Sequence, residues 1–82
     1  MGSMSRQALS QPELLQLLNW ELSAYDQCEG CHFTAIEDLR GDPRPECNWS
    51  GAHLEHDHAL DLAEHAIVQQ VLAETRRIFD LR

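Results

Sequence analysis

The chain contains no lysine. Its six basic residues are all arginines, and they stand against 14 acidic residues, so the formal net charge is −8 at pH 7. Proteins that bind nucleic acid neutralise its phosphates with lysine and arginine. This balance therefore disfavours direct nucleic-acid binding. It suits an acidic solvated surface, a basic protein partner or a face that mimics DNA, and the solvated surface is the simplest of the three.

Long apolar runs are also missing. The most apolar stretch, residues 14–22, is interrupted by Gln16, Asn19 and Glu21, so neither a signal peptide nor a membrane span is expected. Three cysteines cannot all pair within one chain, which argues against a secreted disulfide scaffold. We therefore expect a protein of the reducing cytoplasm that does not contact a membrane.

No catalytic signature is present in the sequence. Ser10, Ser23 and Ser50 lack the G-x-S-x-G surroundings of a nucleophile elbow. The chain has no phosphate-binding loop and no dinucleotide fingerprint. A domain of this size also has little room for a deep pocket. We expect that the protein is not an enzyme.

The length of 82 residues allows one domain. Residues 1–3 before Met4 are typical of an expression remnant, so we expect the native chain to begin at Met4. Residues 1–9 are interpreted as this remnant and a flexible N-terminus. Residues 10–82 are interpreted as a single small domain.

Helical periodicity occurs in two segments. Ser10 can cap a helix and Glu13 can reach back to it, and the leucines that follow have helical spacing, so a helix is predicted over residues 11–26. A second and longer helix is predicted from about Asp57, as its N-cap, to about Asp80. Arginines near its end favour that boundary.

The middle of the chain has a different pattern. Residues 32–40 favour a strand, residues 41–45 favour a turn, and residues 47–54 favour a returning strand or a loop. The predicted fold class is therefore α+β and mostly helical. We expect an N-terminal helix, a short β-hairpin or loop region, and a long C-terminal helix packed on the first.

The most specific pattern is a Cys-x-x-Cys pair followed by a third cysteine and several histidines. Such a pair places two thiolates on one zinc ion with little strain, and a hairpin would return the third cysteine beside it. The fourth ligand would be one of three histidines, of which His58 is the last. We predict a structural zinc that could stabilise a chain too short for a large core. Its predicted ligands are Cys28, Cys31, Cys47 and His56, with His53 as the alternative fourth ligand.

Two other interpretations of the cysteines remain open. All three could be reduced thiols that pack as small apolar side chains. Cys28 and Cys31 could instead form a redox pair, although Cys28 follows a predicted helix, where the helix dipole disfavours a thiolate.

Trp20 and Trp49 can each be interpreted as part of the core or as an exposed anchor for a partner. Two helices with broad apolar faces would also suit a homodimer. From size, charge and thiol spacing we expect a small acidic cytoplasmic protein-interaction or regulatory module, which a structural zinc could stabilise. The alternatives are a thiol redox or metal-handling protein, and a DNA-mimic inhibitor.

Overall fold

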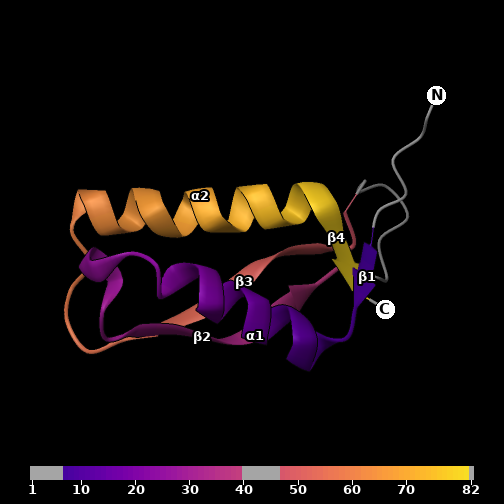
Figure 1. The fold of residues 1–82 in the computed structure, drawn as a ribbon, viewed down its shortest axis with the longest axis horizontal. Coiled ribbons are helices and arrows are strands. Elements are labelled where there is room, and N and C mark those ends of the chain that lie inside the picture. Colours follow the sequence, from indigo (N-terminus) through magenta and orange to yellow (C-terminus); the bar gives the residue numbers. More distant parts are fainter. Residues whose placement is uncertain (1–6, 40–46, 82) are drawn as a thin grey trace.

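The computed structural model describes residues 7–39 and 47–81. Two helices, four strands and one 3-10 turn follow one another in this part of the chain, as Figure 1 shows. In order they are β1 (Gln7–Leu9), α1 (Gln11–Leu22), the 3-10 turn η1 (Asp26–Cys28), β2 (Cys31–Asp38), β3 (Trp49–His56), α2 (Leu62–Ile78) and β4 (Phe79–Leu81).

The expectation of a mostly helical fold is wrong. The described residues form an α+β structure that is 47% helical and 32% strand. The order of elements also differs from the expected one, because β1 precedes the first helix and β4 follows the second. β1 and β4 are parallel partners, with Leu9 opposite Leu81. Each has three residues, which is too short for a periodic pattern to reveal a strand.

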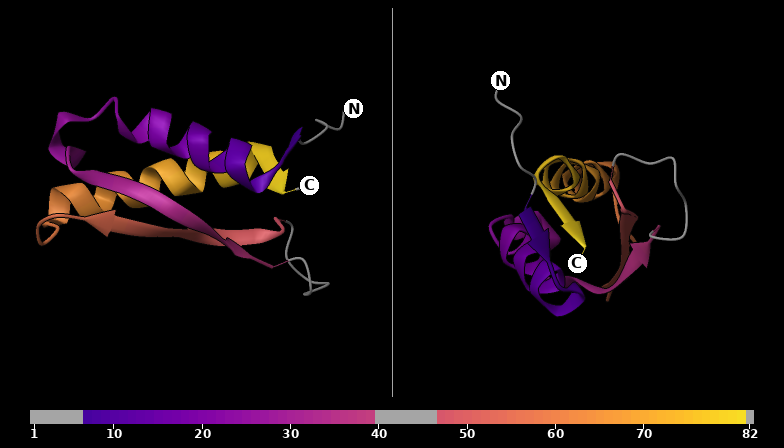
Figure 2. Two further views of the ribbon diagram at one scale, coloured as in Figure 1. Left: turned by 90° about the horizontal axis from the view of Figure 1, so that it is seen from below. Right: turned by 90° about the vertical axis from the view of Figure 1, so that its right-hand side faces the viewer.

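The helices and the long hairpin form two layers. Figures 1 and 2 show α1 and α2 side by side along one face of the β2–β3 hairpin. The β1–β4 pair lies at one end of the molecule, and η1 lies at the other end. The core fills the space between the layers.

The first turn of α1 has the expected capping box. The backbone N–H of Glu13 donates to Oγ of Ser10 at 3.3 Å, and the N–H of Ser10 donates to Oε1 of Glu13 at 2.9 Å. Leu14, Leu18 and Leu22 recur every four residues and are buried against the hairpin and α2. The helix ends at Leu22, before the predicted boundary.

The predicted start of the second helix is wrong. The N-cap of α2 is Asp61, and its carboxylate accepts the backbone N–H of Glu64 at 2.8 Å. The N–H of Asp61 donates in return to Oε1 of Glu64 at 3.2 Å. Asp57 precedes the same apolar pattern but has no acidic residue three positions later, so it cannot form this reciprocal pair.

β2 and β3 form an antiparallel hairpin of two eight-residue strands. Its register runs from Cys31 opposite His56 to Asp38 opposite Trp49. The predicted turn at residues 41–45 lies outside the described residues. The hairpin therefore extends along the molecule, and its two ends are far apart.

The two tryptophans differ in burial. Trp49 is 0% exposed, and its indole N–H donates to the carbonyl oxygen of Phe79 at 3.0 Å. Arg76 donates from Nε to the carbonyl oxygen of Trp49 at 2.9 Å. The interpretation of Trp49 as core is confirmed. The core interpretation is wrong for Trp20, which is 72% exposed.

Asn48 joins the start of β3 to β4. Its side-chain amide donates to the carbonyl oxygen of Leu81 at 2.7 Å, and its Oδ1 accepts the N–H of Leu81 at 2.7 Å. Leu81 is buried, so few other partners are accessible to its backbone. This pair of hydrogen bonds attaches the C-terminal strand to the hairpin.

Replacement of Asn48 by alanine tests this attachment. Asn48→Ala removes both hydrogen bonds and leaves two polar groups of Leu81 without these partners. We expect the free energy of unfolding, measured by urea denaturation, to fall by about 1–3 kcal/mol. Ser50→Ala is the control, because Ser50 is exposed and its hydroxyl donates to the exposed carboxylate of Glu37, and its effect should stay under about 0.5 kcal/mol. Equal effects of the two variants would contradict this role of Asn48.

Candidate functional site

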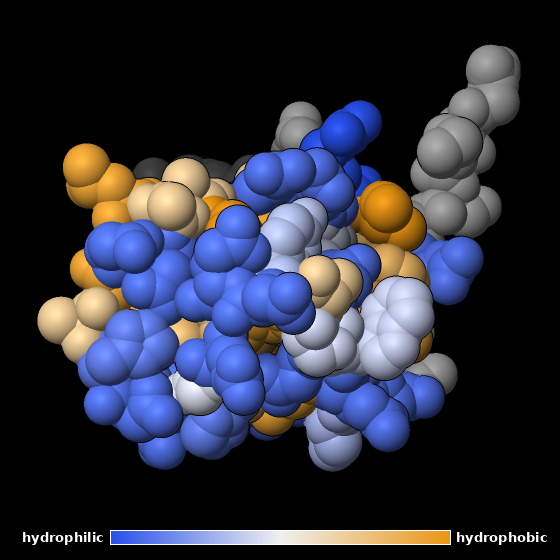
Figure 3. Space-filling model, turned by 60° about the vertical axis from the view of Figure 1, so that its left-hand side comes forward, coloured by the Kyte–Doolittle hydropathy of each residue, from blue (hydrophilic) through white to orange (hydrophobic). Residues whose placement is uncertain are grey.

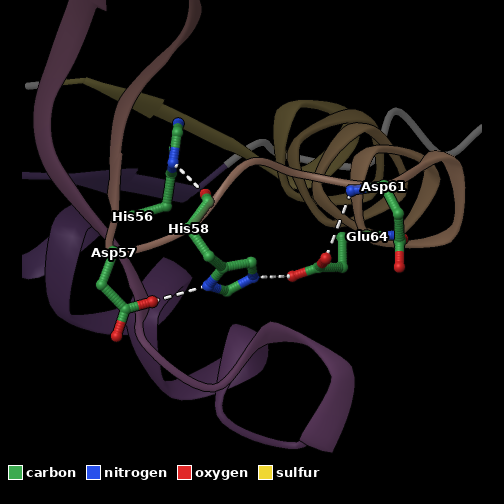
Figure 4. A network of polar contacts seen from close by, with 5 residues as sticks. All are labelled: His56, Asp57, His58, Asp61 and Glu64. Carbon is green, nitrogen blue, oxygen red and sulfur yellow. Dashed lines mark hydrogen bonds and ion pairs between the residues drawn. The ribbon is translucent and has the colours of Figure 1, made fainter.

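The loop between β3 and α2 contains a closely coupled polar cluster (Figure 4). The ring of His58 lies between two carboxylates, with Nδ1 2.6 Å from Oδ1 of Asp57 and Nε2 2.5 Å from Oε2 of Glu64. Asp57 is exposed, whereas Glu64 is buried. Since Glu64 also belongs to the capping box of α2, the cluster connects the end of the hairpin to the first turn of that helix.

The opposite charges of the imidazole and the carboxylates in this cluster stabilise one another. Hydrogen bonds to Asp57 and Glu64 raise the pKa of His58 to about 9. The hydrogen bond from His58 in turn lowers the pKa of Asp57. The imidazole is therefore protonated at neutral pH, and each ring N–H donates to one carboxylate.

Two thiols lie at the same end of the molecule. Cys28 ends η1 and is buried, and Cys31 begins β2 and is half-buried. Burial raises the pKa of both thiols, and the negative charge of Glu64 adds to the rise in each. Raised pKa values disfavour the reactive thiolate, which argues against a redox pair. Sγ of Cys31, a ring nitrogen of His58 and a carboxylate oxygen of Glu64 lie within 4.8 Å of one another.

Gly30 forms the turn between the two thiols. Its φ is +87°, in the left-handed region where a side chain is strained. A Cβ at this position would lie 2.5 Å from Oδ1 of Asp57. The turn thus approaches the carboxylate that contacts His58, and only glycine allows this approach without strain.

The structure does not bring together the four predicted zinc ligands. Cys31 pairs with His56 at one end of the hairpin, whereas Cys47 precedes β3 at the other end. The seven residue steps from His56 to Trp49 span about 23 Å at ~3.3 Å per residue. Cys47 is buried there, and its Sγ lies 3.7 Å from the carbonyl oxygen of Phe79.

The two histidines predicted as fourth ligands have other positions. His56 lies opposite Cys31, but its Nδ1 is 2.6 Å from the carbonyl oxygen of His58, apart from the Asp57–His58–Glu64 chain (Figure 4). His53 is exposed and pairs with Ala35 within the hairpin. Neither imidazole belongs to the group formed with the Cys31 thiol.

His58 was one of the three histidines that the sequence offers as a fourth ligand, whereas Glu64 was not predicted as a site residue. The missed signal was the acidic pair Asp61 and Glu64, whose spacing of three is typical of a capping box. Placing the N-cap at Asp61 leaves His58 in the preceding loop, where its ring can turn toward the helix. The buried position of Glu64 follows from that boundary.

A second feature is a groove between the C-terminal end of α1 and the middle of α2. Its volume of about 430 Å³ lies within the range of volumes found for ligand-binding sites. Glu21 accepts a hydrogen bond from Oγ1 of Thr75 at 2.7 Å, and Glu74 accepts one from Gln70 at 3.2 Å. The lining residues, none of which is basic, are Trp20, Glu21, Ser23, Ala24, Tyr25, Gln70, Val71 and Glu74.

Comparison with models of protein families, with curated proteins and with solved structures finds no match. Over residues 7–39 and 47–81, neither helix has the length and apolar character needed to cross a membrane. Hydrophilic side chains cover most of the face drawn in Figure 3, and apolar ones gather near its edges. The polar cluster and the groove are therefore the two candidate sites of function.

Replacement of Gly30 by alanine tests the close approach of the thiol turn to Asp57. Gly30→Ala places a side chain in left-handed backbone and against a carboxylate. We expect the free energy of unfolding to fall by about 1–2 kcal/mol. Gly51→Ala is the control, since its nearest contact would be the carboxylate oxygen of Glu37 at 3.2 Å and its φ is not positive. A larger loss in Gly51→Ala than in Gly30→Ala would contradict the interpretation.

The raised pKa of His58 predicts a pH dependence of stability. The pKa is 6.5 for the free group and about 9 in the fold, so the imidazolium contributes fully below about pH 6.5. Its contribution is lost as the pH rises through about 9. We expect urea denaturation in the presence of a chelator to show a falling free energy of unfolding between pH 6.5 and 9. His58→Gln should flatten this fall, and an unchanged slope in that variant would refute the assignment.

Proposed function

We propose that this chain is a small acidic protein-interaction module of the reducing cytoplasm. Its proposed ligand is a basic segment of a partner protein, bound in the groove between α1 and α2. The observation that supports this proposal is the exposed side chain of Trp20 beside the carboxylates of Glu21 and Glu74. The three cysteines are free thiols, which suits a reducing compartment.

The groove has the chemistry that a partner arginine or lysine requires. A cation placed over an exposed indole gains about 0.5–1 kcal/mol. The carboxylates of Glu21 and Glu74 add a favourable field for the same cation. Because the groove has no basic lining residue and the chain as a whole carries −8, a positively charged ligand meets no local repulsion there.

Tryptophan is also the residue type that most often dominates interface energetics. Trp20 occupies the surface of a well-anchored helix, since the neighbouring Glu21 is bonded to Thr75 of α2. The backbone that presents the indole is therefore held before a partner binds. Binding of this kind should weaken with added salt, since exposed charges are screened within about 10 Å at 0.1 M ionic strength.

Replacement of Trp20 by alanine tests the groove. Titration of the protein with an arginine-rich peptide should give saturable binding, measured by calorimetry. Trp20→Ala should raise the dissociation constant at least about tenfold, because it removes the exposed indole over which the cation stacks beside Glu74. The free energy of unfolding should change by less than about 0.5 kcal/mol, because the side chain is exposed.

Matched controls separate the groove from the general negative charge. Glu74→Gln should weaken peptide binding more than Glu37→Gln, which removes an exposed carboxylate of β2 that does not line the groove. Leu62→Ala should have no effect on binding, since Leu62 is 90% exposed and does not line the groove. Equal effects of the two glutamate variants, or unchanged binding by Trp20→Ala, would refute the proposal.

A further inference from the structure

Three possible metal ligands converge from three separate segments at the η1 end of the molecule. Cys31 begins β2, His58 lies in the β3–α2 loop, and Glu64 lies in the first turn of α2. Their ligand atoms all lie within 4.8 Å of one another. In a tetrahedral zinc site with these donors, ligand atoms are separated by about 3.3–3.6 Å. The three side chains therefore need to move by only about 1 Å to share an ion.

Cys28 is the candidate for a fourth ligand. It stands three residues before Cys31 and borders the same hollow around Gly30. Cys28 ends η1, and η1 contacts α2, the helix that contains Glu64. A Cys-x-x-Cys turn can bring two thiolates to one metal without strain.

We propose that Cys28, Cys31, His58 and Glu64 bind one zinc ion in a structural site at this end of the fold. The donor set of two sulfurs, one nitrogen and one oxygen consists of atoms that zinc accepts in proteins. It shares Cys28 and Cys31 with the ligand set expected from sequence. It replaces Cys47, which lies at the other end of the hairpin.

The surroundings of the group are those of a supported metal site. A metal-bound histidine usually donates its second ring N–H to a carboxylate, which fixes the orientation of the ring. Asp57 already accepts from Nδ1 of His58, so Nε2 is the nitrogen that faces the ion. Gly30 allows the thiol turn to lie directly against Asp57.

The charges and protons of the binding step balance. Zinc forms bonds to both Sγ atoms, to Nε2 of His58 and to a carboxylate oxygen of Glu64. Two thiol protons and the Nε2 proton of the imidazolium leave to solvent, while the Nδ1 proton stays on the bond to Asp57. Two thiolates and one carboxylate around Zn²⁺ carry a net charge of −1. The N-terminus of α2 favours a negative charge at this place.

The site would add a bond to segments that already pack against one another, since η1 and β3 both contact α2. One ion would hold η1, β2 and the first turn of α2 together. The folded protein contains this group and the unfolded chain does not, so zinc would stabilise the fold through linkage. The proposal is independent of the groove, because no groove residue is a ligand.

The experiment is a zinc titration of protein prepared metal-free under reducing conditions. Native mass spectrometry should show one zinc ion per chain, and competition with a chromophoric chelator gives the dissociation constant. We expect Cys31→Ser and Glu64→Gln each to raise that constant at least about tenfold. Co²⁺ should give the intense visible absorption of a tetrahedral thiolate site. Absence of bound zinc, or unchanged affinity in both variants, would overturn the proposal.

Control variants distinguish this ligand set from the others. Cys47→Ser and His53→Gln should bind zinc as the unchanged chain does. Loss of binding in Cys47→Ser would favour the ligand set expected from sequence and would overturn the one proposed. Zinc binding that survives in Cys31→Ser but weakens in His53→Gln would indicate that only surface histidines bind the ion. That result would also overturn the proposed ligand set.

A variant outside the ligand set separates a loss of zinc binding from a loss of folding. Asp57→Asn keeps all four ligands and should weaken zinc binding by about 10–100-fold, because it removes the carboxylate partner of Nδ1. Circular dichroism in chelator shows whether each variant retains its helices before zinc is added. Trp20 is exposed and is not a proposed ligand, so Trp20→Ala should keep full zinc affinity. Unchanged affinity in folded Asp57→Asn would contradict the proposed role of His58.

Discussion

Trp49 begins β3 without any exposed surface, and its indole N–H and its carbonyl oxygen both bond to residues where α2 ends and β4 begins. Its indole N–H reaches Phe79, and its carbonyl oxygen accepts from Arg76. A buried indole N–H requires such a partner, so the start of the hairpin cannot shift relative to the helix. The pairing of β2 with β3 then carries this constraint along the hairpin to Cys31 and His56.

The opposite end of the hairpin is held by Glu64. Its carboxylate caps α2 and also accepts from His58, and a buried carboxylate needs such donors to offset its lost hydration. The hairpin is thus attached to α2 at both ends, by a tryptophan at one and by an imidazolium–carboxylate contact at the other. The proposed zinc ion would replace the second attachment with a stronger one and would include the thiols.

The groove lies on a different side of the structure because of helix geometry. At 100° per residue, Trp20 is about 200° from both Leu18 and Leu22, so burial of those leucines directs the indole to solvent. The helical spacing of the leucines is present in the sequence, but the side of α1 that faces solvent follows from the packing of Leu18 and Leu22 in the core. The bond between Glu21 and Thr75 holds α1 against α2 beside the exposed indole. The proposed zinc site and the proposed interaction surface therefore occupy separate parts of one small molecule.

Features that depend on neighbouring residues can be predicted from the sequence alone. These are the capping box of Ser10 and Glu13, the glycine turn between two thiols and the acidic charge without lysine. The β1–β4 pairing, the separation of Cys47 from Cys31 and the contact of Cys31 with Glu64 follow from the three-dimensional fold instead. These features differ from the first group in the distance along the chain between the residues involved. A cap forms between groups three residues apart, whereas these contacts depend on the path of the whole chain and on the burial that selects it.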